Sequence, residues 1–97
     1  MYLISGRVSM EFKQLEMFVA VAEERSMMRA AERVFRTQPA VSMALAKLEQ
    51  EIGSCLFQRS RQGGFQLTAA GRVLWDYAKR MLALRDEAAQ VVMAKAR

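Results

Sequence analysis

Apolar residues recur at helical spacing in three short runs between residues 12 and 52, and only a few residues separate one run from the next. Within each run the apolar positions are mostly three or four residues apart, so they share one face of a helix. The positions are Phe12, Leu15, Phe18, Val19 and Ala22, then Met27, Ala30, Ala31 and Val34, and then Val41, Leu45, Leu48 and Ile52. The pattern predicts three short helices joined by tight turns.

Residues that favour helix ends stand between these runs. Ser26 and Thr37 precede the second and third runs, where a hydroxyl can accept a hydrogen bond from a free N–H group of the first turn. Pro39, the only proline, lies in the first turn of the third helix, where its missing N–H leaves no bond unmade. Gly53 follows that helix, at a position where a left-handed C-cap is common.

The pattern changes after the third run. Residues 56–60 and 65–67 read as two short strands, and the residues between them include two adjacent glycines that are typical of a turn. A small β-hairpin is predicted here. Phe57, Phe65 and Leu67 are expected to face the helices.

A long helix is predicted from residue 69 to residue 96, with Thr68 as its N-cap. Its apolar residues form a heptad seam with alternating spacings of three and four, which is typical of paired helices. The seam residues are Leu74, Tyr77, Met81, Leu84, Ala88 and Val91. A second apolar stripe lies beside the seam, at Trp75, Ala78, Leu82, Ala89 and Val92. Two stripes require two partners, and we expect one to be the helix's own domain and the other a second copy of the chain.

Together these elements predict a mainly α fold, a winged helix-turn-helix of three helices and a two-stranded β-hairpin wing, followed by a long C-terminal dimerisation helix. The domain organisation is predicted to be an extension over 1–9, a winged helix-turn-helix domain over 10–67, and a linker and dimerisation helix over 68–97. The extension has no clear periodicity and is expected to be disordered.

Several classes of function are disfavoured by composition. Histidine is absent and Cys55 is the only cysteine, so the chain lacks the groups for a histidine-based triad, a histidine metal site or an internal disulfide. We expect that the chain is not an enzyme and binds no metal or cofactor. No apolar run approaches the roughly 18–20 residues of a membrane span, so no membrane partner is expected. A free thiol without bridges fits a cytoplasmic location.

The third helix carries short or uncharged side chains on the face opposite its apolar stripe. We predict that Gln38, Pro39, Ser42 and Met43 read DNA bases, because an amide can pair with adenine and an apolar side chain can contact a thymine methyl group. Ser42 is able to donate to a base or a phosphate. Spacing alone also fits ordinary solvated side chains at these positions.

Basic residues surround this face. From Arg25 to Lys47 the chain has five basic residues and one acidic residue, and the whole chain carries a formal net charge of +5. Such a distribution suits a polyanionic partner, although a solvated charged surface is the usual alternative. The residues predicted to contact phosphates or to act from the wing are Arg29, Arg33, Arg36, Thr37, Lys47, Arg59 and Arg61.

Residues along most of the chain match the sequence pattern of a known family. The matching parts are residues 12–24, the residues Ser26, Ala30 and Ala31 in the spacing S-x-x-x-A-A, the run Thr37-Gln38-Pro39-Ala40-Val41-Ser42, then Leu45, Leu48, Glu49 and Gly53, and finally Leu56, Phe57, Arg59, Leu67, Thr68 and Gly71 in the pattern L-F-x-R…L-T-x-x-G. Over about residues 10–92 the chain resembles the N-terminal DNA-binding domain of LysR-type transcriptional regulators. So many spaced matches are far more specific than one short motif.

The resemblance implies a bacterial transcriptional regulator that binds double-stranded DNA at a palindromic operator. It further implies a third helix in the major groove, a wing on the minor groove or the backbone, and a homodimer through the linker helix. LysR-type regulators also have a C-terminal domain that binds a small-molecule effector, and we expect that domain to be absent from this chain.

The chain departs from the family pattern at three methionines. Met27 and Met28 stand where the family usually has an aromatic or other apolar residue and then Ser or Thr, and Met43 replaces a common Arg or Lys. The departure at Met43 predicts an altered sequence preference. Two alternatives stay open at this point, a coiled-coil protein-interaction module and a winged-helix regulator of another family. Salt-dependent binding to duplex DNA separates DNA binding from a protein-interaction module.

Overall fold

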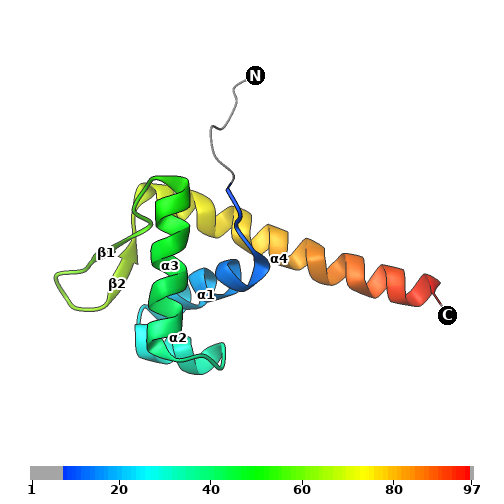
Figure 1. Ribbon diagram of the computed structural model, residues 1–97, viewed down its shortest axis with the longest axis horizontal. Coiled ribbons are helices and arrows are strands. Elements are labelled where there is room, and N and C mark those ends of the chain that lie inside the picture. Colours follow the sequence, from blue (N-terminus) through cyan, green and yellow to red (C-terminus); the bar gives the residue numbers. More distant parts are fainter. Residues whose placement is uncertain (1–7, 97) are drawn as a thin grey trace, which may run out of the picture.

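A computed structural model describes residues 8–96 of the chain. The elements in order are α1 (Phe12–Glu24), α2 (Met27–Arg33), α3 (Gln38–Ile52), β1 (Phe57–Arg59), β2 (Phe65–Leu67) and α4 (Ala69–Lys95). The two strands pair antiparallel, with Phe57 opposite Leu67 and Arg59 opposite Phe65. The prediction of a mainly α winged helix-turn-helix with a long last helix is confirmed (Figure 1). The predicted extension over 1–9 lies mostly outside the described residues.

The predicted caps set the helix limits. The Ser26 hydroxyl accepts a hydrogen bond from the Arg29 N–H at 3.2 Å, and the Thr37 hydroxyl accepts one from the Ala40 N–H at 3.2 Å. The Thr68 hydroxyl accepts from the Gly71 N–H at 3.0 Å and donates to the Cys55 carbonyl at 2.7 Å. Each cap satisfies an N–H group that the helix itself leaves free.

The core lies between α1, α2, α3 and the first half of α4. Its largest fully buried side chains are Phe18, Leu15, Leu48, Leu56, Val21 and Val41. Ala30 and Ala78 are completely buried, because these small side chains let α2 and α4 approach α1 closely. Phe12, by contrast, is 47% exposed although it belongs to the periodic pattern, since it is the first residue of α1.

The long helix α4 has two different halves. In the first half Ala78 is buried, Trp75 and Leu82 are half-buried against the core, and Gly71 packs closely against the Leu56 carbonyl. From Asp86 to Ala96 every residue is exposed. Figure 1 shows this second half running out beyond the other helices, at the far end of the molecule from the hairpin. The longest dimension of the molecule is therefore 52 Å, against 38 and 21 Å across.

Candidate nucleic-acid interface

The outer face of α3 is exposed, and its N-terminal half carries uncharged side chains. Val41, Leu45 and Leu48 turn inward, and the predicted base-reading residues all lie exposed. Those residues are Gln38, Pro39, Ser42 and Met43. Met43 is 72% exposed, so most of this large apolar side chain is accessible to solvent. The structure therefore brings these four residues together at the N-terminal end of one helix.

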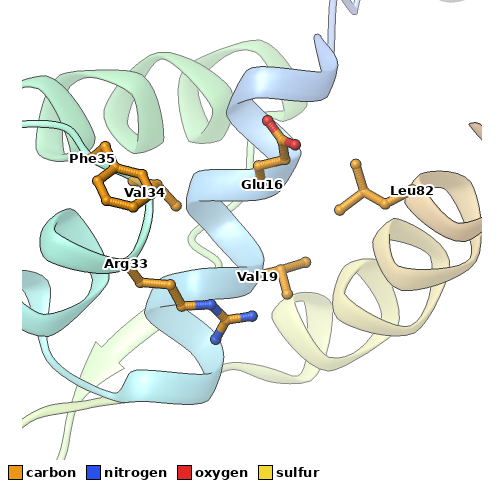
Figure 2. Close-up of a pocket in the computed structure, with 6 residues that line it drawn as sticks. All are labelled: Glu16, Val19, Arg33, Val34, Phe35 and Leu82. Atoms are coloured by element: carbon orange, nitrogen blue, oxygen red, sulfur yellow. The ribbon is translucent and has the colours of Figure 1, made fainter. Parts of the chain in front are cut away.

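Two of the predicted phosphate-contacting arginines are held by carboxylates of α1. An Arg33 guanidinium nitrogen lies 2.8 Å from a Glu23 carboxylate oxygen, and another lies 3.3 Å from Glu24. The pKa of Arg33 is raised above its ordinary value, mainly by the hydrogen bond with Glu23. Arg29 donates to the Glu24 backbone carbonyl at 2.9 Å, and its Nε lies 3.8 Å from a Glu24 carboxylate oxygen. Figure 2 shows the Arg33 side chain directed toward α1 and Val19.

The remaining predicted cations are exposed. Arg36 follows the turn between α2 and α3, and Lys47 lies one turn beyond Met43 on the outer face of α3. Within the described residues, neither side chain has a hydrogen-bond or ion-pair partner. Thr37 is also exposed, but its hydroxyl is occupied as the N-cap acceptor.

The hairpin presents its arginines to solvent and its apolar side chains to the core, as predicted. The ring of Phe57 lies 5.2 Å from that of Phe18, centroid to centroid, and Phe65 and Leu67 are half-buried. Arg59 is exposed, and its guanidinium lies 5.2 Å from the centre of the Phe65 ring. Arg61, in the turn between the strands, is exposed as well.

Glu49 connects α3 to the hairpin, a role that the sequence did not reveal. One oxygen of its half-buried carboxylate accepts hydrogen bonds from the Leu56 N–H at 2.7 Å and the Phe57 N–H at 3.4 Å. The carboxylate thus satisfies backbone N–H groups at the point where the chain leaves α3 and enters β1. Because the partner groups are backbone atoms, no residue type marks them in the sequence.

Replacing Glu49 by alanine is expected to destabilise the domain by about 1–3 kcal/mol, since it leaves a buried N–H without an acceptor. Glu49→Gln keeps an acceptor oxygen and should lose clearly less. Urea denaturation followed by circular dichroism measures both values. The exposed Glu32→Ala is the control and should unfold like the unchanged protein. Equal stabilities for Glu49→Ala and Glu49→Gln would contradict this role for the carboxylate.

Phe35, in the turn between α2 and α3, is the most exposed large apolar residue described, at 93%. Its φ of 58° is in the left-handed region, which aromatic residues seldom adopt. Figure 2 shows Phe35 with Val34, Arg33, Val19, Glu16 and Leu82 around a groove of about 360 Å³. The sequence predicted no role for Phe35.

The predicted seam of α4 is divided between two environments. Leu74 and Met81 are half-buried, and with Ile52 and Leu56 they line an apolar groove of about 440 Å³ on the domain's own surface. The other seam residues are exposed, namely Tyr77, Leu84, Ala88 and Val91. The second stripe packs against the core only through its first half. Hence the domain itself uses part of each stripe and leaves the rest of both in water.

The described residues contain no group of three or more His, Cys, Asp or Glu side chains placed to hold a metal ion. Over the same residues, no helix is both long enough and apolar enough to cross a membrane.

Known proteins resemble this chain in sequence and in structure. The family described as "Bacterial regulatory helix-turn-helix protein, lysR family" matches residues 12–72. The HTH-type transcriptional regulator TfdT of Cupriavidus pinatubonensis is 42% identical over 88 residues, which are 91% of this chain and 38% of TfdT. The HTH-type transcriptional regulator ClcR of Pseudomonas putida is 44% identical over 73 residues, which are 75% of this chain and 24% of ClcR.

The fold is also similar to that of a solved protein–DNA complex. In the crystal structure of the CbnR_DBD–DNA complex, the protein is 40% identical to this chain, with a TM-score of 0.84. The match covers 91% of this chain and all of that one. Only 29% of the CbnR chain is covered in the CbnR crystal structure, with a TM-score of 0.82. The chain thus spans less than two fifths of the length of TfdT, ClcR and CbnR.

Proposed function

The chain belongs to the lysR family of bacterial regulatory helix-turn-helix proteins, and from this membership we propose that it reads a specific DNA sequence through α3. It is a DNA-binding domain of the LysR type, and the family is not enzymatic. The match also excludes a winged-helix regulator of another family. The observation that carries the proposal is the exposed, uncharged N-terminal half of the α3 outer face, bordered by the cations Arg36 and Lys47.

The base-reading roles follow from the chemistry of each side chain. Gln38 can donate and accept at once, as the edge of adenine requires, and Ser42 can exchange a hydrogen bond with a base or a phosphate. Pro39 and Met43 offer apolar surface to thymine methyl groups. All four are exposed at the same end of α3, the end that enters the major groove in helix-turn-helix proteins.

The phosphate contacts are proposed for the cations that surround α3 and the wing. The exposed side chains of Arg36, Lys47, Arg59 and Arg61 are available to contact the DNA backbone, and Thr37 follows Arg36 at the start of α3. Arg29 and Arg33 are less available for phosphate contacts than the other residues of the predicted set, because both contact Glu24. Arg33 in particular is engaged with two carboxylates of α1, and we propose that it contributes less to DNA binding than the others.

We further propose that two chains bind one palindromic operator as a homodimer through α4. Exposed apolar residues along the seam support this pairing, because Leu84 and Val91 have no cover within the described chain. The pair would place two recognition helices about 34–36 Å apart, one helical turn of DNA. In this division, residues 10–67 bind DNA and residues 68–97 link and dimerise. We also propose a cytoplasmic location, no cofactor for this domain, and control by a small-molecule effector bound outside it.

Gln38→Ala tests the base-reading role. We expect a loss of about 1–3 kcal/mol of binding free energy at the cognate site and a much smaller loss on random duplex DNA, because only the cognate site offers the matched base. Selection from a randomised duplex pool identifies the cognate site, and fluorescence anisotropy then measures both affinities. The control is Arg80→Ala on α4, where Arg80 pairs with Asp76 at 2.8 Å. An equal loss on cognate and random DNA would remove Gln38 from the base-reading set.

A further inference from the structure

The hairpin is fastened to the end of α1 through Arg25. This residue follows α1 in the left-handed conformation, with φ 56° and ψ 24°. Its carbonyl accepts a hydrogen bond from the Phe65 N–H at 3.3 Å, and its side-chain Nε donates to the Phe65 carbonyl at 3.4 Å. Both backbone polar groups of Phe65 are thus engaged by one residue that lies 40 positions earlier in the chain.

Gly64 lies so close to Arg25 that no side chain fits there. A Cβ atom added to Gly64 would stand 2.7 Å from the Arg25 carbonyl oxygen, and Gly64 has a φ of +77°. Its neighbour Gly63 has a φ of +91° but open space around an added Cβ. The two glycines are therefore matched in backbone conformation and differ in whether they meet Arg25.

This contact continues to the arginines of the wing. The Gly64 carbonyl accepts a hydrogen bond from the Ser60 N–H at 3.1 Å, and Ser60 lies between Arg59 and Arg61. The Arg59 guanidinium itself lies over the Phe65 ring. Each strand has only three residues, and a two-stranded hairpin of this size is marginal without further support. Glu49 supports the base of β1, and Arg25 supports the beginning of β2.

We propose that the contact of Arg25 with Gly64 and Phe65 sets the direction of the wing and so positions Arg59 and Arg61 against the DNA backbone. Arg25 acts here as a positioning residue, chiefly through its backbone carbonyl. The inference rests on the proposed DNA contact of the wing and adds the feature that orients it. A wing released from Arg25 keeps its charges but no longer holds them at the phosphates.

The test compares Gly64→Ala with the matched control Gly63→Ala. Binding to cognate duplex DNA is measured at several salt concentrations, which gives the slope of log K against log salt. Arg59→Ala combined with Arg61→Ala should reduce this slope by roughly 2, since each lost phosphate contact reduces it by about 0.9. Gly64→Ala should produce a similar reduction, and Gly63→Ala should leave the slope unchanged. In a protein that already carries Arg59→Ala and Arg61→Ala, adding Gly64→Ala should not reduce the slope of log K against log salt any further.

The outcomes distinguish the inference from the proposed function. If the double arginine variant lowers the slope and Gly64→Ala does not, the positioning role of Arg25 is overturned and the wing contact stands. If the double arginine variant leaves the slope unchanged, the wing contact fails, and the positioning role fails with it. A further reduction by Gly64→Ala in the arginine-free background would also overturn the inference, because the change would then act elsewhere.

A measurement on the unchanged protein covers the case in which Gly64→Ala does not fold. Backbone NMR order parameters for residues 60–65 should be near those of α1, about 0.85, and the Phe65 amide should be protected from hydrogen exchange. Order parameters below about 0.6 in the hairpin would show a wing that Arg25 does not hold.

Discussion

Replacing both Leu84 and Val91 by glutamate is expected to give a folded monomer that binds a two-half-site DNA about 10²- to 10⁴-fold more weakly than the unchanged protein. The loss arises because two linked domains bind adjacent half-sites together, whereas separate domains must bind one at a time. Leu84 and Val91 are 63% and 53% exposed in the single chain, so glutamate at these positions disturbs no contact of the domain's own core. In a paired seam, however, the new carboxylates would be buried beside like charges.

The structure makes this double variant a better test than one that includes Met81. Met81 is half-buried against the domain's own core, so a charge there would affect folding and pairing together. Ala83→Glu combined with Gln90→Glu is the matched control, because it adds charge with the same seven-residue spacing to exposed positions outside both stripes. Sedimentation gives the oligomeric state and circular dichroism the folding. A Leu84→Glu/Val91→Glu protein that stays dimeric would refute the seam.

Phe18→Ala is expected to lower the free energy of unfolding by about 3–5 kcal/mol, the largest stability change that we predict for one substitution. Phe18 is completely buried. The centre of its ring lies 5.2 Å from the centre of the Phe57 ring of β1, and the two ring planes are inclined at 53°. The substitution therefore leaves a cavity where α1 meets the wing. Since a domain of this size has a free energy of unfolding of only about 5–15 kcal/mol, the substitution would remove a large part of it.

Urea denaturation of Phe18→Ala measures this loss directly. Phe12→Ala is the control in the same helix, because Phe12 is half exposed and its change should stay within about 1 kcal/mol. If the two substitutions proved equally mild, Phe18 would not be the centre of the core.

The parts of the fold that were predictable from the sequence depend on local chemistry. Ser26, Thr37 and Thr68 cap the helices where they were predicted to do so, because an N-cap interaction spans only two or three residues. The exposed face of α3 was predictable for a related reason. Once the period places Val41, Leu45 and Leu48 inside, the opposite positions must face solvent.

Contacts between distant parts of the chain were not predictable in this way. The pairing of Arg33 with Glu23 depends on how α2 crosses α1, and the contact of Arg25 with Gly64 depends on where the hairpin folds back. Charge clustering alone therefore grouped Arg33 with the residues predicted to contact phosphates. On α4, periodicity revealed both stripes but not how the domain divides them, since both stripes have the same period. Only packing shows that Leu74 and Met81 are partly covered by the chain itself while Leu84 is not.

The exposed second half of α4 has a geometric consequence for operator choice. An α-helix advances about 1.5 Å per residue, so in an antiparallel pair a slip of one heptad changes the separation of the two domains by about 10 Å. At roughly 3.4 Å per base pair, that slip corresponds to about three base pairs of spacer between half-sites. In the homodimer that we propose, the register in which the exposed residues from Asp86 to Ala96 pair would set the spacing between the half-sites that the dimer can bind.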